Sequence, residues 1–255
     1  MARPHTFTAV GNAQIDTAQF KFGAASGLFD GTGDYITTPT DSDFTFGTGD
    51  FTVEFFVRFN SLAVVPQVIC GEYIVVGQPL GWIIYVDTDG LHLAYSKNGA
   101  NGNTDTPKAW SPSTNTWYHV AIVNNGGTIT WYVDGTSIGT LSLAGDSIDG
   151  LSILFYVGQQ SLGSYLNGWV DELRIVKGTA VYTTDFTPPA SVLTNVTNTK
   201  LLLHFEGADA STTFTDSDTD PGPANVKTKN GLAIASDKTI NNLAISSVKS
   251  VNGVT

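Results

Sequence analysis

The stretch VGQQSLGSYLNGWVDELRIV, residues 157–176, decides the fold of this chain. It reads as a strand, a glycine-rich bend and a second strand. Because side chains alternate across a strand, the pattern places Asp171 on the same, apolar side as Leu173. Glu172 and Arg174 then share the opposite side, where they can pair. A carboxylate on an apolar side is costly unless backbone N–H groups, a base or a metal satisfy it, so Asp171 is a candidate site residue.

A second stretch, residues 51–59, shows the clearest strand pattern in the chain. Apolar residues occupy every second position, which predicts a half-buried strand in a sandwich. The same alternation along residues 128–134 and 167–176 extends the expected interior. Seven side chains are expected to be buried between two sheets: Val53, Phe55, Val57, Trp131, Val133, Leu173 and Ile175.

Turn residues divide the remainder of the first 180 positions into short strands. Asp89-Gly90 and Gly126-Gly127 each lie between two apolar runs, which predicts two hairpins. Residues 97–112 are polar and predict a long loop that contains Trp110. No convincing helical period appears before residue 180. The pattern predicts an all-β fold, with two antiparallel sheets packed as a jelly-roll sandwich.

Composition excludes several classes of function. The 255 residues carry a net charge of −11 with only 12 Lys and Arg, which argues against phosphate contacts to nucleic acid. No apolar run approaches the roughly 20 residues of a membrane span, so no membrane partner is expected. Cys70 is the only cysteine, which rules out an internal disulfide. No signal peptide is visible at the start, so synthesis in a cytoplasm is expected.

Three further segments carry a family resemblance together with the opening stretch. They are GLFDGTGDY at 27–35, DFTVEFFVRF at 50–59 and WYVDG at 131–135. With VG…GWVDELRI they resemble laminin-G-like, concanavalin A-like jelly-roll domains, over roughly residues 7–205. That family includes lectins, pentraxins, glucanases and structural modules, so the resemblance implies the fold more than the function. The segment DELRIVKGTAVYTTDFTPP, residues 171–189, is most similar to bacteriophage virion proteins that carry such a domain.

Enzymatic activity is not expected, and no catalytic residue is assigned. Residues 135–139, GTSIG, match a nucleophile motif but lead into another strand instead of a helix. Glucanases related to this fold carry paired acids at close spacing on one strand. The four glutamates of this chain do not have that spacing: Glu54, Glu72, Glu172 and Glu206.

Aromatic side chains offer candidate contacts to a glycan, since their faces can stack on sugar rings. Tyr85 and Tyr132 are expected to point away from the core, and Trp110 lies in the predicted loop. These three residues are the candidate glycan site. His92 and His204 are expected to be ordinary surface or interface residues.

A structural calcium is the one cofactor left open. Some laminin-G-like domains hold such an ion near the aspartate that matches Asp171, and the alternative is that Asp171 caps backbone N–H groups. The acidic run at residues 216–220 is similar to part of an EF-hand loop, but Lys227 stands where the bidentate glutamate belongs. That run is expected to be a solvated loop.

The chain divides into a jelly-roll domain, residues 1–210, and an extended C-terminal tail, residues 211–255. The segment LLLHFEG at 201–207 resembles a strand that stands first in tandem relatives, so the module looks permuted. This last strand closes either its own sheet or a neighbour's. The tail is too polar to build a core, and its aliphatic residues are expected to attach it to a partner: Ile240, Leu243, Ile245, Val248, Val251 and Val254.

The sequence therefore favours a non-enzymatic structural protein of a phage virion, such as a capsid decoration, fibre or tail-associated protein. Other virion proteins are the expected partners, and a homo-oligomer such as a trimer would suit the tail. The alternative function is a lectin-like module that binds host-surface polysaccharide. The two functions can coexist in one protein.

Overall fold

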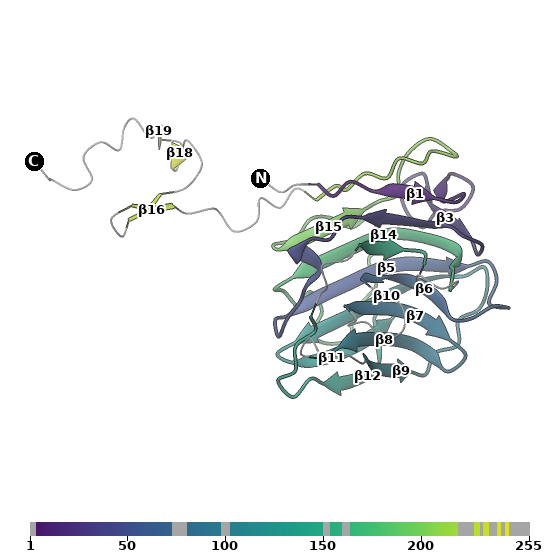
Figure 1. Ribbon diagram of the computed structural model, residues 1–255, viewed down its shortest axis with the longest axis horizontal. Helices are drawn as coiled ribbons and strands as arrows, with labels where there is room; N and C mark the ends of the chain where they lie inside the picture. The colour runs from purple at the N-terminus through teal and green to yellow at the C-terminus, as the bar shows by residue number, and fades with distance from the viewer. Residues whose placement is uncertain are drawn as a thin grey trace, which may run out of the picture.

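The computed structural model describes residues 4–72, 81–97, 103–149, 154–159 and 164–218, and four short strand segments after them. Figure 1 shows β-strands stacked into a sandwich, which confirms the predicted all-β jelly-roll class. Among the described residues the one helical element is a 3-10 turn, η1 (Ser42–Phe44). None of them forms a helix of the length and apolar character that a membrane crossing requires.

One sheet has seven antiparallel strands, and it contains the hairpin predicted around Asp89-Gly90. The predicted loop at 97–112 is wrong in part, because residues 103–108 form an edge strand. Their sequence NTDTPK lacks apolar alternation, and the strand is held by backbone pairing to its neighbour. The strand order is β1 (Thr8–Val10), β4 (Tyr35–Thr38), β13 (Phe155–Val157), β6 (Gln67–Glu72), β7 (Trp82–Asp87), β8 (Gly90–Ser96) and β9 (Asn103–Lys108).

The second sheet has eight antiparallel strands and contains the hairpin predicted around Gly126-Gly127. Along the sheet the order is β12 (Thr136–Ser142), β11 (Thr128–Val133), β10 (Trp117–Asn125), β5 (Phe51–Phe59), β14 (Asn167–Lys177), β3 (Ser26–Asp30) and β2 (Gln14–Asp16). The eighth strand, β15 (Thr199–Leu203), also pairs with β14. It therefore closes the sheet of its own chain, which decides between the two alternatives left open. Strand β3 was not predicted, since glycines interrupt its pattern.

The core lies between the two sheets, and all seven residues predicted for it are buried. None of them is more than 9 % exposed. The prediction that β5 is half-buried is wrong, because Thr52, Glu54 and Phe56 on its second face are also within 1 % of full burial. Residues 178–198 cover Thr52 and Glu54 on this outer face, while Phe56 packs edge-on against Phe22, with ring centroids 5.2 Å apart. Val181 N–H donates to Thr52 Oγ1 at 2.9 Å, and Tyr182 OH donates to Glu54 Oε2 at 2.7 Å.

A bulge in β14 overturns the predicted sides of the opening stretch. Asp171 lies opposite Phe56 of β5, yet Arg174 lies opposite Glu54, so β14 carries one extra residue between these pairs. Glu172 occupies the bulge with φ of 54°. Val170 therefore enters the core on one side of the bulge and Leu173 on the other.

The bulge has two consequences for the predicted contacts. Asp171 lies on the outer face with Phe56, not on the apolar side with Leu173, so that prediction is wrong. Glu172 and Arg174 are not paired with each other. Glu172 accepts from Leu193 N–H, while Arg174 pairs with Glu54. A pattern of strict alternation cannot anticipate a bulge, because one inserted residue exchanges the two faces.

After β15 the chain continues along the sandwich beyond residue 210. Phe214 is 5 % exposed within the core, and Ser217 N–H donates to the Leu202 carbonyl at 2.8 Å. Thr215 forms a bridge to Thr6, which brings the two ends of the sandwich together. The contacts of the sandwich therefore extend at least to residue 217.

The segments farther along the chain form two short antiparallel hairpins. One joins β16 (Lys227–Lys229) to β17 (Leu232–Ile234), and the other joins β18 (Thr239–Ile240) to β19 (Leu243–Ala244). Among the predicted attachment residues, Ile240 and Leu243 are register partners in the second hairpin. The others lie outside the described residues: Ile245, Val248, Val251 and Val254. The attachment role of these six residues stays a prediction.

Candidate functional site

An aromatic and acidic cluster lies on the outer face of the seven-stranded sheet. Trp82, Ile84 and Val86 of β7 point into the core, so Tyr85 between them points outward, as predicted. Tyr85 lies directly opposite His92 of β8, and the two rings stack with centroids 4.3 Å apart. Directly opposed residues on one face of a sheet are close enough for such contacts.

Two carboxylates complete this cluster and remain partly in solvent. Tyr85 OH donates to Asp105 Oδ2 at 2.5 Å, and Asp105 Oδ1 lies 3.0 Å from His92 Nδ1. Asp89 Oδ1 lies 2.7 Å from His92 Nε2. The side chains of Asp89 and Asp105 are 60 % and 36 % exposed. We call these four residues, Tyr85, Asp89, His92 and Asp105, the outer acidic cluster.

The electrostatics of the outer acidic cluster favour hydrogen bonding over proton transfer. Burial, together with the neighbouring Asp105 carboxylate, raises the pKa of Tyr85, so its hydroxyl stays a donor. The hydrogen bond from His92 lowers the pKa of Asp89, so that carboxylate stays ionised at neutral pH. His92 is only 5 % exposed, so it is not a surface residue, and the alternative of an interface residue stays a prediction. The spacing of three residues between Asp89 and His92 could have indicated this contact.

The structure does not bring the three predicted glycan residues together. Tyr85 lies on the outer face of the seven-stranded sheet. Trp110 follows β9 and packs edge-on against Tyr118, with ring centroids 5.3 Å apart. Tyr132 points outward from the eight-stranded sheet, as predicted, but it is 3 % exposed and packs against Phe186. The three rings therefore do not form one platform, and any shared role in binding stays a prediction.

The fold agrees with what sequence comparison finds. Residues 30–182 match the family described as the concanavalin A-like lectin/glucanases superfamily. The chain belongs to this superfamily. A search of curated proteins found no match.

Solved structures with a similar concanavalin A-like fold include two toxin domains and one domain of a glycosidase. The binding domain of Paraclostridial mosquitocidal protein 1 is 16 % identical, with a TM-score of 0.56, over 70 % of this chain and 45 % of that one. The botulinum neurotoxin serotype D binding domain is 15 % identical, with a TM-score of 0.52, over 70 % and 44 %. This chain thus matches less than half of each toxin domain.

The third similar structure is matched over most of its own length. It is domain 4 of AbnA, a GH43 extracellular arabinanase from Geobacillus stearothermophilus, in complex with arabinotriose. The identity is 20 % and the TM-score is 0.54, over 71 % of this chain and 85 % of that one. At such identities these likenesses show the fold alone.

Asp171 lies on the outer face of the eight-stranded sheet. It is nevertheless fully buried, because residues 21 and 22 lie over it. Its Oδ2 accepts from Lys21 N–H at 2.8 Å and from Phe22 N–H at 3.0 Å, which confirms the expected bonds to backbone. Its Oδ1 has no hydrogen-bond partner among the described residues. Burial raises the pKa of Asp171 to about 7. A calcium ion at this carboxylate stays a prediction.

Glu54 is the centre of a second polar group, which residues 178–198 cover. Its carboxylate accepts from Arg174 Nε at 2.9 Å and Nη2 at 2.6 Å, and from Tyr182 OH. His119 Nε2 lies 3.1 Å from Glu54 Oε2. Burial would raise the pKa of Glu54, but His119 and Arg174 outweigh it and lower that pKa. We call these four residues the covered network, and its burial suits stabilisation of the sandwich.

Proposed function

We propose that this chain is a non-enzymatic carbohydrate-binding module that contacts a glycan through the outer acidic cluster. The observation that carries the proposal is an aromatic ring beside two exposed carboxylates at the outer face of the seven-stranded sheet. The likeness of the fold to a domain solved with arabinotriose supports it. The four glutamates of the chain lack the close spacing of the paired acids in related glucanases, which supports the non-enzymatic part.

The chemistry of the cluster suits sugar recognition. Ionised Asp89 and Asp105 accept hydrogen bonds, and sugar hydroxyls donate them, which gives short charge-assisted contacts. Tyr85 adds an apolar ring surface for the C–H face of a sugar. His92 bridges the two carboxylates and holds their spacing before any ligand arrives. Ligand sites typically combine a small number of convergent polar groups with an apolar surface.

A glycan array with the purified full chain, followed by calorimetry on the glycans that bind, tests this proposal. We expect Asp105→Asn and Tyr85→Ala to weaken binding at least tenfold, because each removes one cluster contact. Thr128→Ala is the matched control, since Thr128 is exposed on the other sheet. Binding that the cluster variants leave unchanged, or silence across the whole array, would contradict the proposal.

We propose further that the module works within a phage virion, attached to other virion proteins or to copies of itself through the part of the predicted tail that follows residue 217. The resemblance of DELRIVKGTAVYTTDFTPP to virion proteins and the regular spacing of Val248, Val251 and Val254 support this setting. Synthesis in the host cytoplasm fits it. Deletion of residues 224–255 should leave a folded sandwich that no longer joins the particle or oligomer. Normal assembly of the truncated protein would place the attachment surface on the sandwich instead.

A further inference from the structure

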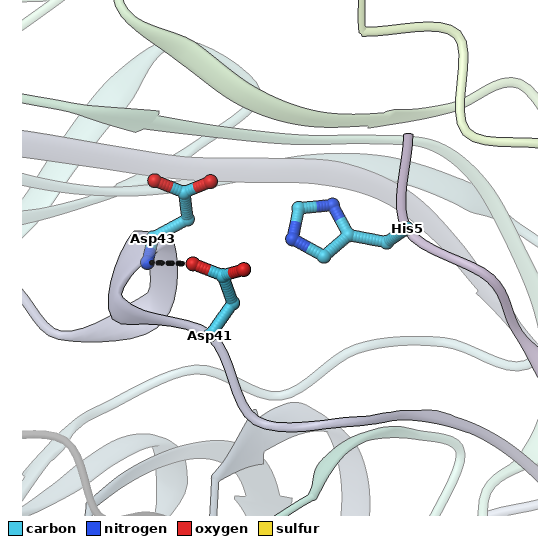
Figure 2. A group of neighbouring side chains, drawn as sticks. All are labelled: His5, Asp41 and Asp43. Carbon is cyan, nitrogen blue, oxygen red and sulfur yellow. Dashed lines mark hydrogen bonds between the residues drawn. The ribbon is translucent and has the colours of Figure 1, made fainter. Parts of the chain in front are cut away.

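A histidine near the start of the sandwich faces two aspartates from the segment between β4 and β5. Ligand atoms of His5, Asp41 and Asp43 all lie within 4.8 Å of one another. Figure 2 shows one ring nitrogen of His5 pointing toward both carboxylates. His5 lies more than 30 positions before the two aspartates in the sequence, so the fold brings it to them.

The His5 ring is held in place by contacts on its other side. Its backbone N–H and its Nδ1 both contact Asp216 Oδ2, at 2.8 and 2.9 Å. The ring also packs against Phe44, with centroids 4.8 Å apart, and its side chain is only 6 % exposed. Since a carboxylate oxygen only accepts, the proton lies on Nδ1 and the lone pair of the neutral ring lies on Nε2. A carboxylate that orients a histidine in this way is typical of metal ligands.

The Nε2 atom is buried and makes no hydrogen bond with the residues that the structure describes. A buried polar atom without a partner is unusual, because its desolvation is then not compensated. The Asp216 side chain cannot rotate to contact Nε2, because its Oδ1 accepts from Leu202 N–H at 3.1 Å and from Asp218 N–H at 2.9 Å. The groups that Nε2 does face are carboxylates, and a cation between them would satisfy both.

The two aspartates are presented by a firmly anchored turn. One oxygen of Asp41 accepts from Asp43 N–H at 3.1 Å and caps η1, while its other oxygen points toward His5 (Figure 2). Phe44 at the end of η1 is fully buried, and its carbonyl accepts from Trp82 Nε1 at 2.8 Å. The turn therefore has a fixed backbone, and the carboxylates need only side-chain rotation to approach an ion.

We propose that His5, Asp41 and Asp43 bind a divalent transition-metal ion of the zinc class, with Asp216 as a positioning residue. An imidazole nitrogen with two carboxylates suits zinc, whereas calcium takes six or more oxygen ligands. In a tetrahedral zinc site neighbouring ligand atoms lie about 3.3–3.5 Å apart. The side chains must therefore close slightly, and exposed Asp41 has the freedom to do so. A water molecule would take the fourth position.

Positive charges nearby limit the affinity without opposing the geometry. Lys177 and Lys200 act electrostatically on Asp43, and Lys177 Nζ donates to the Ser42 carbonyl at 2.6 Å. The two ligand carboxylates and Asp216 outnumber these cations. Bound metal would connect the N-terminal segment, the turn before β5 and, through Asp216, the end of the sandwich. This role is independent of glycan binding, which the opposite end of the seven-stranded sheet would perform.

Calorimetry and Co²⁺ absorption spectroscopy on the chelator-treated full chain test the proposal. We expect one equivalent of Zn²⁺ to bind, with Co²⁺ giving the visible bands of a low-coordinate N/O site, and Ca²⁺ to bind at least tenfold more weakly. Asp41→Asn and Asp43→Asn should each weaken Zn²⁺ binding at least tenfold, and His5→Gln should abolish it. The two aspartate variants keep the test valid if His5→Gln fails to fold.

Two controls separate this site from incidental metal binding. Asp30→Asn alters an exposed aspartate that also accepts from the N–H two residues on, and it should bind Zn²⁺ as the natural chain does. His92→Gln removes a histidine between two aspartates of the outer acidic cluster; it should weaken glycan binding and leave Zn²⁺ binding unchanged. Absence of Zn²⁺ binding, or binding lost only in His92→Gln, would overturn the proposal. So would equal binding of Ca²⁺ and Zn²⁺.

Discussion

The outer faces of the two sheets carry similar polar residues in very different surroundings. On the eight-stranded sheet, residues 178–198 cover Glu54. Its carboxylate accepts hydrogen bonds from Arg174 and Tyr182 and lies beside His119. On the seven-stranded sheet, Asp105 accepts a hydrogen bond from Tyr85 and lies beside His92, yet the Asp105 side chain remains 36 % exposed. Each group thus combines a carboxylate, a histidine and a tyrosine, and the difference between them is the covering segment.

We expect burial to decide the role of such a group. A covered carboxylate must have partners, since an unpaired buried charge is strongly destabilising. An exposed one costs little when unpaired, because water solvates it, and it stays free to exchange water for a ligand. The covered network is therefore expected to govern stability, and the outer acidic cluster to govern binding.

The largest effect is expected from Glu54→Ala. The variant leaves Arg174 and His119 buried without their partner, which should lower the free energy of unfolding by about 3–5 kcal/mol. Urea denaturation followed by tryptophan fluorescence would measure the loss. Glu54→Gln, which keeps the shape and one acceptor, should lose less. A loss below about 1 kcal/mol in Glu54→Ala would show that the network does not stabilise the sandwich.

The next largest effect concerns Asp171 and pH. Folding raises the pKa of Asp171 from 3.8 to about 7, so the folded state binds the extra proton between these values. The contribution of Asp171 to the free energy of unfolding therefore falls as pH rises from about 4 to about 7. The loss is at most about 4 kcal/mol, since each pKa unit corresponds to about 1.4 kcal/mol.

Denaturation of Asp171→Asn and the natural chain, at several pH values with a chelator present, measures this dependence. The variant should show a flatter profile between pH 4 and 7, while Asp30→Asn should keep the natural slope. Identical profiles for all three proteins would contradict the raised pKa. Repeating the series with Ca²⁺ tests the calcium prediction, because a bound ion would stabilise the natural chain most at the upper end of the range.

A smaller effect is expected from Phe186→Ala, which thins the covering segment. Phe186 stacks on Tyr182 with centroids 3.6 Å apart and contacts His119 edge-on at 5.6 Å. Because it is half-buried, we expect a loss of about 2 kcal/mol, below the range for a fully buried phenylalanine. Hydrogen exchange of residues 178–198 should rise in the same variant. Unchanged exchange there would indicate that other contacts hold the segment.

The smallest effect on stability is expected from Asp105→Asn in the outer acidic cluster. Its partially exposed contacts should contribute no more than about 1 kcal/mol to the free energy of unfolding. The variant should nevertheless lose glycan binding, as proposed above. A variant that is strongly destabilised would show that the outer acidic cluster has a structural role similar to that of the covered network.

Local pattern alone determined many of the strands, though not β3 or β9, and much of the interior. Residues 51–59 and the two hairpins could be predicted because alternation and turn residues act over a few positions. The buried positions Val53, Phe55 and Trp131 followed from the same period, and the outward direction of Tyr85 and Tyr132 followed from it as well. The family resemblance rests on these segments, which is why the fold class was predictable in full.

Tertiary structure decided the surroundings of those side chains. The bulge at Glu172 moved Asp171 to the outer face, and residues 178–198 then buried Glu54. The covering segment also removed Tyr132 from any open surface, while Tyr85 kept its acidic neighbours. His5 meets Asp41 and Asp216 only because the ends of the sandwich and the turn before β5 converge. Each of these contacts joins residues distant in sequence, and their spacing along the chain holds no information about distance in space.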